Sequence, residues 1–472
     1  MTPLLRVHAE GRPDAPALVA PERIWTYRDL EAAVSGTARR MVAEGLGAGD
    51  RVALRPERDA RTIILLWALW RIGAVAVPLS LRLPPAVQRE RAQRLNCHLF
   101  VGAEASGERD LRVCSPADLL RENPPADRVP SVLPVDRDAT IVCTSGSTGR
   151  PKAALHSWAN HLYSAKGSNA NLPLRPGDRW LLSLPLYHVG GLAILVRCAL
   201  AGAAVALPPP DSSPATALSE TDATHTSYVA TQFQRLLAET SAPPPALRAV
   251  LLGGGPIPSA LLDRAHAHRW PVLTSYGCTE MASQVTTTFP GASRSALNTA
   301  GRRLPHRRLR IDEDGQILVA GRTLFRGYVE GEELRDPRTA TGWYPTGDRG
   351  ELDAQGRLRV VGRMDRMFIS GGENIQPEEI EAALEQLSGV IRAVVVPVPN
   401  ATYGERPVAF LEGEEEDASV LRERLAERLP AFKIPDAFYR FPGEGEREGL
   451  KVDRRKLAAW AETNHEGSGS TP

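Results

Sequence analysis

Short apolar runs alternate with helix-periodic segments along much of this 472-residue chain, and this alternation constrains the fold more than any other feature. Residues 51–55 and 74–78 read as buried strands, and residues 29–44 and 61–72 have the periodicity of helices. Strands that alternate with helices predict a parallel sheet covered by helices. The pattern returns farther along the chain, where strands are expected at 180–184, 203–207, 224–229, 249–252 and 272–275.

The last third of the chain follows different patterns. Residues 301–361 carry short strand-like runs separated by turns, which predicts a small β-rich subdomain. Beyond residue 362 the order helix, strand, strand, helix is expected at 377–386, 392–398, 407–411 and 418–428. This order predicts a separate α+β domain of about 100 residues, an ordinary domain size.

These patterns together predict an α/β protein in two domains. The large N-terminal domain is expected over residues 1–362 and the small C-terminal domain over residues 367–463. Residues 464–472 are small and polar, so we expect a disordered tail there.

Composition excludes several classes of function. The formal net charge is +1, so nothing indicates binding to nucleic acid or to an anionic membrane. We expect no signal peptide and no membrane span, because the longest apolar stretch, 62–70, is too short to cross a bilayer. The five cysteines are scattered without a Cys-x-x-Cys pair, which predicts reduced thiols in a cytoplasm and no structural zinc.

Segment 144–153 carries the strongest chemical signal. A strand-like run, 138–143, precedes it, and an apolar-periodic segment, 153–165, follows. Glycines allow close approach of the backbone, hydroxyl and N–H groups bind anionic oxygens, and a lysine adds positive charge. The residues that predict a polyphosphate site in this way are Thr144, Ser145, Gly146, Ser147, Thr148, Gly149 and Lys152.

Two other interpretations of this segment were weighed. A flexible linker is disfavoured by the preceding strand and by the Pro-Lys ending. A kinase or NTPase loop is disfavoured because the spacing is Gly-x-x-Gly-x-x-Lys and not Gly-x4-Gly-Lys-Ser/Thr.

Four later motifs are weak alone, since each has a structural alternative such as a turn, a loop or a capped helix start. They lie at 185–191, 253–256, 275–281 and 344–349. In this order after segment 144–152, they resemble the adenylate-forming superfamily of acyl-CoA synthetases, luciferases and peptide-synthetase adenylation domains. The resemblance extends from about residue 15 to about residue 460.

The resemblance implies a site for ATP and Mg²⁺. Segment 144–152 corresponds to the loop that holds the β- and γ-phosphates, and Glu280 to the acidic residue that helps to hold Mg²⁺, a cation that prefers oxygen ligands. Asp348 and Arg363 correspond to residues at the ribose, and Asp365 to a hinge at 363–366 about which the small domain moves. The other implied nucleotide residues are Gly253, Gly254, Gly255, Tyr276, Gly277 and Thr279.

The resemblance also implies two half-reactions. Lys451 corresponds to the lysine that enters the site for adenylation, where an ammonium lowers the repulsion between a carboxylate and the α-phosphate. From the residues alone, Lys451 reads as a solvated charge in a basic stretch, and only the resemblance gives it this role. Gly371 and Gly372 correspond to the loop that lines the coenzyme A tunnel after rotation. His188 corresponds to the gate between that tunnel and the acyl pocket.

Arg197 bears on the choice of acid. It lies alone in the apolar run 192–200, nine residues after His188, on the helix that lines the acyl pocket in these enzymes. Burying an unpaired guanidinium is costly. The partner is either a carboxylate of the fold or a second carboxylate of the substrate, unless the side chain reaches solvent. Ser283 is a further candidate for this pocket.

A narrower resemblance concerns segments 224–237, 371–380 and 403–409, which look like those of the o-succinylbenzoate–CoA ligases of menaquinone biosynthesis. This resemblance implies a small-molecule carboxylic acid, ATP and coenzyme A as the partners of the protein. The alternatives are another aryl- or short-chain acyl-CoA ligase, an amino-acid adenylation enzyme and a non-catalytic protein. Arg197 discriminates among the acids, because a monocarboxylate gives it no partner. A homo-oligomer is left open.

Overall fold

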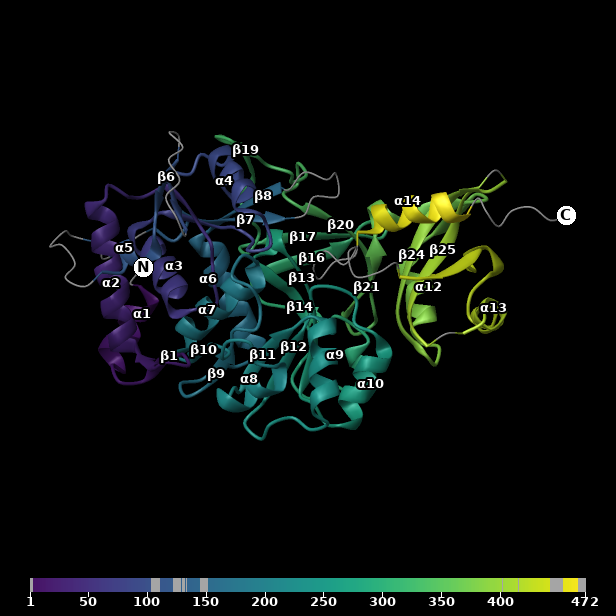
Figure 1. Ribbon diagram of the computed structural model, residues 1–472, viewed down its shortest axis with the longest axis horizontal. Coiled ribbons are helices and arrows are strands. Elements are labelled where there is room, and N and C mark those ends of the chain that lie inside the picture. Colours follow the sequence, from purple (N-terminus) through teal and green to yellow (C-terminus); the bar gives the residue numbers. More distant parts are fainter. Residues whose placement is uncertain are drawn as a thin grey trace.

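The computed structural model describes residues 3–102, 111–121, 129, 132, 134–144, 152–400, 402–414, 416–441 and 453–465. Within these ranges the chain forms a large N-terminal part with three sheets and a smaller C-terminal part with one sheet (Figure 1). The C-terminal part lies at the end of the molecule opposite α1 and α2. The predicted α/β class is confirmed.

The largest sheet described has nine strands. Six neighbouring strands, from β13 to β1 in the sheet order, are parallel, as the alternating pattern predicts. Antiparallel strands close both edges. In sheet order the strands are β15 (Arg302–Arg303), β14 (Ser283–Thr287), β13 (Val272–Cys278), β12 (Ala249–Leu252), β11 (His225–Tyr228), β9 (Arg179–Leu181), β10 (Ala204–Ala206), β1 (Pro16–Val19) and β2 (Ile24–Thr26).

The second large sheet has eight strands in the described residues, five of them parallel. The other three strands lie together at one end of the sheet order, and each is antiparallel to its neighbours in the sheet. In sheet order the strands are β19 (Glu333–Arg335), β18 (Gly327–Glu330), β8 (Lys152–Ser157), β7 (Asp138–Thr144), β4 (Val75–Pro78), β3 (Arg51–Leu54), β5 (Leu99–Val101) and β6 (Arg112–Cys114).

The apolar segment after the phosphate-type loop is not a single periodic helix. Its first residues form β8, which pairs with β7, and the helix α6 begins only at Trp158. Ser157 sets this boundary, because its Oγ accepts from the backbone N–H of Asn160 while its own N–H donates to the Asn160 side chain.

One hydrophobic cluster joins both large sheets through α3, α6 and α7. Trp67 and Trp70 of α3 pack against each other and against Trp158 of α6, at centroid distances of 5.2 to 5.9 Å. The helices of the N-terminal part are α1 (Leu4–Gly11), α2 (Tyr27–Ala43), α3 (Ala60–Ile72), α4 (Pro85–Arg94), α5 (Pro116–Leu119), α6 (Trp158–Asn171), α7 (Val189–Ala201), α8 (Pro214–Glu220), α9 (Ala230–Glu239), α10 (Ser259–Ala267), α11 (Arg294–Leu297) and the 3-10 turn η1 (Thr279–Met281).

A four-stranded antiparallel sheet forms part of the predicted β-rich region, residues 301–361, and β15, β18 and β19 from the same range extend the two large sheets. The structure also excludes two of the structural alternatives for the motifs. The motif 344–349 lies within a strand and not in a turn. The motif 275–281 contains the end of β13 and the turn η1, and it does not start an α-helix. The strands are β16 (Arg307–Ile311), β17 (Gln316–Gly321), β20 (Tyr344–Leu352) and β21 (Leu358–Arg363).

The C-terminal part follows the turn η2 (Met364–Arg366) and has the predicted α+β character. The helix α14 continues through Asn464 to His465, so the prediction of a disordered tail from residue 464 is wrong for these two residues. The elements are β22 (Phe368–Ser370), β23 (Glu373–Ile375), α12 (Pro377–Leu384), β24 (Val390–Asn400), β25 (Gly404–Gly413), α13 (Ala418–Ala426), η3 (Ala431–Lys433), β26 (Ala437–Arg440) and α14 (Arg454–His465).

The described residues were expected from composition to lack a membrane span, a structural zinc site and disulfides. None of their helices is long and apolar enough to cross a membrane. They contain no cluster of three or more His, Cys, Asp or Glu side chains that could hold a metal ion. All five cysteines are free thiols.

Candidate active site

The hairpin of β7 and β8 holds the two ends of the glycine- and hydroxyl-rich segment side by side. Thr144 ends β7 opposite Lys152, the first residue of β8, and its Oγ1 donates to the Lys152 carbonyl over 3.4 Å. Ser145, Gly146, Ser147, Thr148 and Gly149 lie outside the described residues. The Lys152 side chain is exposed at this edge of the sheet.

Tyr328 on β18 links Lys152 to Glu280. The Lys152 Nζ lies 5.1 Å from the centroid of the Tyr328 ring, and the Tyr328 hydroxyl donates to Glu280 Oε1 over 2.5 Å. The Tyr344 hydroxyl lies 2.8 Å from the Tyr328 hydroxyl and donates to it, because the Tyr328 proton already points to the carboxylate. Burial and the Glu280 charge raise the pKa of both tyrosines, which therefore remain protonated donors.

The same chain of contacts orients Glu280. Its backbone carbonyl accepts from the Phe325 N–H over 2.7 Å, and the preceding Thr279 carbonyl lies 2.7 Å from His156 Nε2. A half-buried carboxylate beside a lysine and an exposed loop edge has the chemistry of a Mg²⁺ ligand next to phosphates. Tyr328, Tyr344 and His156 were not assigned a role from the sequence. Tyr328 and His156 lie in strands that read as core, and Tyr344 opens the motif 344–349, in which only Asp348 was given a role.

A second cluster joins Tyr276, Asp348, Arg363 and Asp365. The Tyr276 hydroxyl donates to Asp348 Oδ2 over 2.6 Å, and Arg363 Nη1 donates to Asp348 Oδ1 over 3.1 Å. Arg363 also donates from Nε and Nη2 to the two carboxylate oxygens of Asp365, each over 3.0 Å. The pKa of Arg363 is raised, first by its hydrogen bonds to Asp365 and then by the charge of Asp348. Residues from three distant segments thus meet in one site.

Two glycines near this cluster are required by close packing. A Cβ at Gly277 would lie 2.2 Å from the Ser283 carbonyl oxygen, and a Cβ at Gly253 would lie 2.6 Å from Ser275 Oγ. Gly253 follows β12 and the 275–281 motif ends β13, which are parallel neighbours. Gly253, Gly254 and Gly255 therefore lie at the carboxyl edge of this sheet, where open α/β sheets bind their ligands.

The helix α7 carries His188 and Arg197. His188 is the exposed residue just before the helix, and Arg197 is 1% exposed near its other end. Arg197 Nη2 donates to Ser283 Oγ over 3.2 Å, and its guanidinium carbon lies 5.2 Å from the centroid of the Trp180 ring. Arg197 Nε is buried without a hydrogen bond. No carboxylate of the described residues forms a salt bridge with this guanidinium.

Two of the alternatives for Arg197 are therefore wrong within the described part of the chain: the side chain neither reaches solvent nor pairs with a carboxylate of the fold. Burial lowers the pKa of Arg197 to about 10, so it remains charged at neutral pH. Its aromatic neighbour Trp180 stacks on His225, whose pKa burial lowers to about 4, so that neighbour is neutral. The guanidinium is a buried cation whose aromatic neighbours are neutral.

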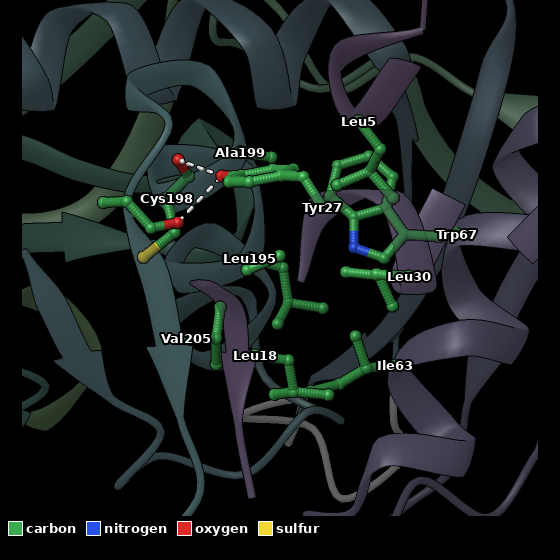
Figure 2. A pocket seen from close by; sticks show the side chains of 12 residues that line it. Leu5, Leu18, Tyr27, Leu30, Ile63, Trp67, Leu195, Cys198, Ala199 and Val205 are labelled. Atoms are coloured by element: carbon green, nitrogen blue, oxygen red, sulfur yellow. Dashed lines mark hydrogen bonds between the residues drawn. The ribbon is translucent and has the colours of Figure 1, made fainter. Parts of the chain in front are cut away.

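A cavity on another face of α7 is not a substrate pocket. Figure 2 shows apolar side chains around it, among them Leu5, Leu30 and Leu195. Its volume is about 10 Å³, at the lower limit for one water. The Tyr27 hydroxyl donates to the Ala203 carbonyl over 2.8 Å beside this cavity (Figure 2), and so fixes the end of α7.

Gly371 and Gly372 lie in the turn between β22 and β23, in the C-terminal part. Both are exposed and have positive φ angles, 57° and 87°. The Gly371 N–H donates to the Tyr403 carbonyl over 2.9 Å. Among the described residues, no hydrogen bond joins this turn to the Tyr276–Asp348 cluster. Lys451 lies outside the described residues.

Comparisons with known proteins agree on one family. Residues 5–329 match the AMP-binding enzyme family, and residues 379–444 match the AMP-binding enzyme C-terminal domain. The 2-succinylbenzoate–CoA ligase of Bacillus licheniformis is 34% identical over 471 residues, which cover 96% of this chain and 98% of that protein. The 2-succinylbenzoate–CoA ligase of Salmonella typhimurium is 35% identical over 450 residues, 95% of each chain.

Two solved structures of o-succinylbenzoate coenzyme A synthetase from Bacillus subtilis share the fold. The complex with the acyl-adenylate intermediate OSB-AMP has a TM-score of 0.89 at 30% identity and covers 97% of this chain and 98% of that one. The complex with ATP and magnesium ion has a TM-score of 0.88 at 30% identity, with coverage of 97% and 99%.

Proposed function

Because the chain belongs to the AMP-binding enzyme family, we propose that it uses ATP to join o-succinylbenzoate to coenzyme A, as in menaquinone biosynthesis. The observation that carries the choice of acid is Arg197, a buried guanidinium with no carboxylate partner among the described residues. O-succinylbenzoate has two carboxylates, one to be activated and one left over. The second supplies the counter-charge that the described residues do not provide.

The nucleotide end of the site is assigned to the two clusters. Thr144, Lys152 and the segment between them hold the phosphates, and Glu280 holds Mg²⁺. Bound there, Mg²⁺ neutralises phosphate charge and orients the phosphates. Asp348 accepts from the ribose hydroxyls, which fits its position between the donors Tyr276 and Arg363, because each carboxylate oxygen can accept a second hydrogen bond. The adenine lies against Tyr276 and the loop at Gly253, Gly254 and Gly255.

The acid end is assigned to α7. The nine residues from His188 to Arg197 span about 13 Å of helix. The aromatic carboxylate pairs with Arg197 and Ser283 at the closed end, and the succinyl carboxylate extends toward His188 and the phosphates. A bidentate guanidinium–carboxylate pair fixes the direction of the acid as well as its charge.

The reaction then proceeds in two steps without a protein nucleophile. The succinyl carboxylate attacks the α-phosphate, which forms the acyl-adenylate and releases pyrophosphate; Lys451 stabilises the charge that develops. The small domain turns about Asp365 and brings the Gly371–Gly372 turn to the site. The coenzyme A thiol then attacks the acyl carbonyl past His188, and AMP leaves. We place the reaction in the cytoplasm, which suits five free thiols.

A substrate panel tests the proposal. The purified protein is given ATP, Mg²⁺ and coenzyme A with o-succinylbenzoate, benzoate, coumarate or a medium-chain fatty acid, and thioester, AMP and pyrophosphate are measured. We expect o-succinylbenzoate to give the highest kcat/KM. Preference for benzoate or coumarate identifies the protein as another aryl-CoA ligase and refutes the choice of acid. ADP as the nucleotide product refutes the reaction class.

Arg197 is tested by substitution with Lys and with Met. Arg197→Met is expected to raise the KM for o-succinylbenzoate at least about a hundredfold, the order expected when one partner of a buried charge pair is lost. Arg197→Lys keeps the charge but loses the bidentate geometry, so its KM should lie between those of wild type and Arg197→Met. The exposed Arg310→Met is the matched control. An unchanged KM in Arg197→Met contradicts the assignment.

A further inference from the structure

A second buried arginine contacts the residue that follows Ser283, the partner of Arg197. Arg307, the first residue of β16, is 1% exposed. It donates only to neutral oxygens: the Gln284 carbonyl over 2.5 Å, the Pro305 carbonyl over 2.8 Å, and the carbonyl and Oγ of Ser164 over 3.2 Å each. Within the described residues it forms no salt bridge. The described part of the chain therefore buries two guanidinium charges without supplying a carboxylate for either.

The two arginines meet the same strand at adjacent positions. Arg197 donates to the side chain of Ser283, and Arg307 donates to the backbone of Gln284. The Arg197 charge is one of the causes that lower the pKa of Arg307, to about 9, after burial itself. The two charges therefore act on each other through a region that water does not screen.

The backbone that carries Ser283 is strained. Ala282 has φ of 51° and Ser283 has φ of 113°, in a region that residues with a Cβ rarely adopt. Such strain persists only where surrounding contacts hold it, and it often marks a functional site. The Ser164 hydroxyl donates to the Ala282 carbonyl over 2.7 Å on one side of the turn, and Arg307 holds Gln284 on the other.

Arg307 also joins the two halves of this support. Its Nη2 donates to the Ser164 Oγ, which supports Ala282, and its Nε donates to the Gln284 carbonyl. One side chain therefore stabilises the turn from both sides. The turn sets the direction of the Ser283 hydroxyl, whose oxygen accepts a hydrogen bond from Arg197. Loss of the support would let the turn relax and move Ser283 away from the guanidinium.

We propose that Arg307 is a positioning residue for acid selection. With Ser164 it holds the Ala282–Ser283 turn in its strained form, and its charge adds to the positive potential at Arg197. The pocket is thereby built for an acid that brings a second carboxylate, and an acid without one enters a site with two uncompensated charges. This inference rests on the proposed function and extends it from the residue that binds the acid to the residues behind it.

The test compares two acids that differ only in the second carboxylate: o-succinylbenzoate and 3-benzoylpropanoate, which lacks the aromatic carboxylate. KM and kcat are measured for each acid, and KM for ATP, in wild type, Arg307→Met, Arg307→Lys and Ser164→Ala. The exposed Arg308→Met, on the same strand, is the control. Unfolding temperatures check that each variant is folded.

Arg307→Met is expected to raise the KM for o-succinylbenzoate about tenfold or more, the effect of losing one charge-assisted contact, and to change the KM for 3-benzoylpropanoate and for ATP less than about twofold. Ser164→Ala, which leaves both charges, should give a smaller rise with the same selectivity. The rise in KM for Arg307→Lys should lie between those for Arg307→Met and Ser164→Ala, because lysine keeps the charge but loses the hydrogen bonds that hold the turn.

The outcomes separate the two proposals. If wild type does not ligate o-succinylbenzoate, the proposed function fails. If wild type does so and Arg307→Met lowers the efficiency for both acids equally, or leaves both unchanged, the positioning role is overturned and the proposed function stands. If Arg307→Met does not fold, the same comparison between the two acids is decided by Ser164→Ala and Arg307→Lys.

Discussion

Replacing Tyr328 with Phe isolates one hydrogen bond of the candidate Mg²⁺ site. The ring remains, so the packing in the core and the contact 5.1 Å from Lys152 Nζ are kept. The hydroxyl is lost, and with it the 2.5 Å donation to Glu280 Oε1 and the acceptor for the Tyr344 hydroxyl. The Glu280 carboxylate then loses its tyrosine donor, while its backbone carbonyl contact with Phe325 and its side-chain contact with Cys278 remain.

Two opposing effects decide the magnitude. Without the tyrosine proton the carboxylate is more basic, which favours a cation. Without its orienting partner the carboxylate must be ordered when the cation binds, and losing such a partner typically costs ten- to a hundredfold in metal affinity. A hydrogen bond to a charged group contributes about 1.5–3 kcal/mol, and Glu280 is only half-buried, so we use about 1.5 kcal/mol. The orientation effect dominates and predicts about a tenfold rise in the Mg²⁺ requirement.

The assay is pyrophosphate release at saturating o-succinylbenzoate and ATP, titrated with Mg²⁺. Tyr344→Phe is the matched control, because it removes the second hydroxyl of the chain and leaves the Tyr328–Glu280 bond intact. We expect the Mg²⁺ midpoint to rise in Tyr328→Phe and to move by less than about threefold in Tyr344→Phe. Equal midpoints in Tyr328→Phe and wild type would refute the role assigned to Glu280 and its tyrosine.

Three further predictions concern the small domain and the support of α7. Lys451→Ala is expected to abolish pyrophosphate release from ATP and acid but to spare thioester formation from supplied acyl-adenylate; equal loss of both half-reactions contradicts its assignment. Glu385 is half-buried, and the loss of solvation raises its pKa to about 7, so its protonated form is favoured by folding and stability should fall as pH rises from about 4.5 to 7; Glu385→Gln should flatten this fall in a thermal-unfolding series over pH, whereas the exposed Glu423→Gln should not. Tyr27→Phe leaves the buried Ala203 carbonyl without the Tyr27 donor and should destabilise the protein by about 1–3 kcal/mol, seen as a lower unfolding temperature with little change in the KM for ATP.

Much of the fold could be predicted from the sequence because strand and helix patterns are local. The strand 249–252 was predicted at the bounds observed, and the helix predicted at 61–72 begins only one residue earlier. The segment after the phosphate-type loop was harder, because an apolar run can be strand or helix. Lys152 to Ser157 became a strand because β7 lies beside them, and that pairing is not a local property.

The candidate site shows the same difference between local sequence patterns and contacts that form only in the folded chain. Residues in recognisable motifs, such as Glu280 and Asp348, could be singled out because their order along the chain resembles a family. Tyr276, which contacts Asp348, was among the predicted residues, but the chain of Tyr328 and Tyr344 hydroxyls that ends at Glu280 was not predicted. Only the folded chain shows that the Tyr328 hydroxyl meets the Glu280 carboxylate and that the Tyr344 hydroxyl meets Tyr328.

The two buried arginines show why a sequence reveals one charge and hides another. Arg197 attracted attention because its neighbours at 192–200 are apolar, so a lone cation contradicts the local pattern. Arg307 lies in a stretch that also contains Arg303, Arg308 and Arg310, where an arginine is expected to face solvent. Yet the exposures of Arg197 and Arg307 in the structure are both 1%. Burial depends on what packs against a residue and not on the composition around it. A charge-rich stretch can therefore conceal a pocket residue, and such residues have to be sought by the oxygens that contact them.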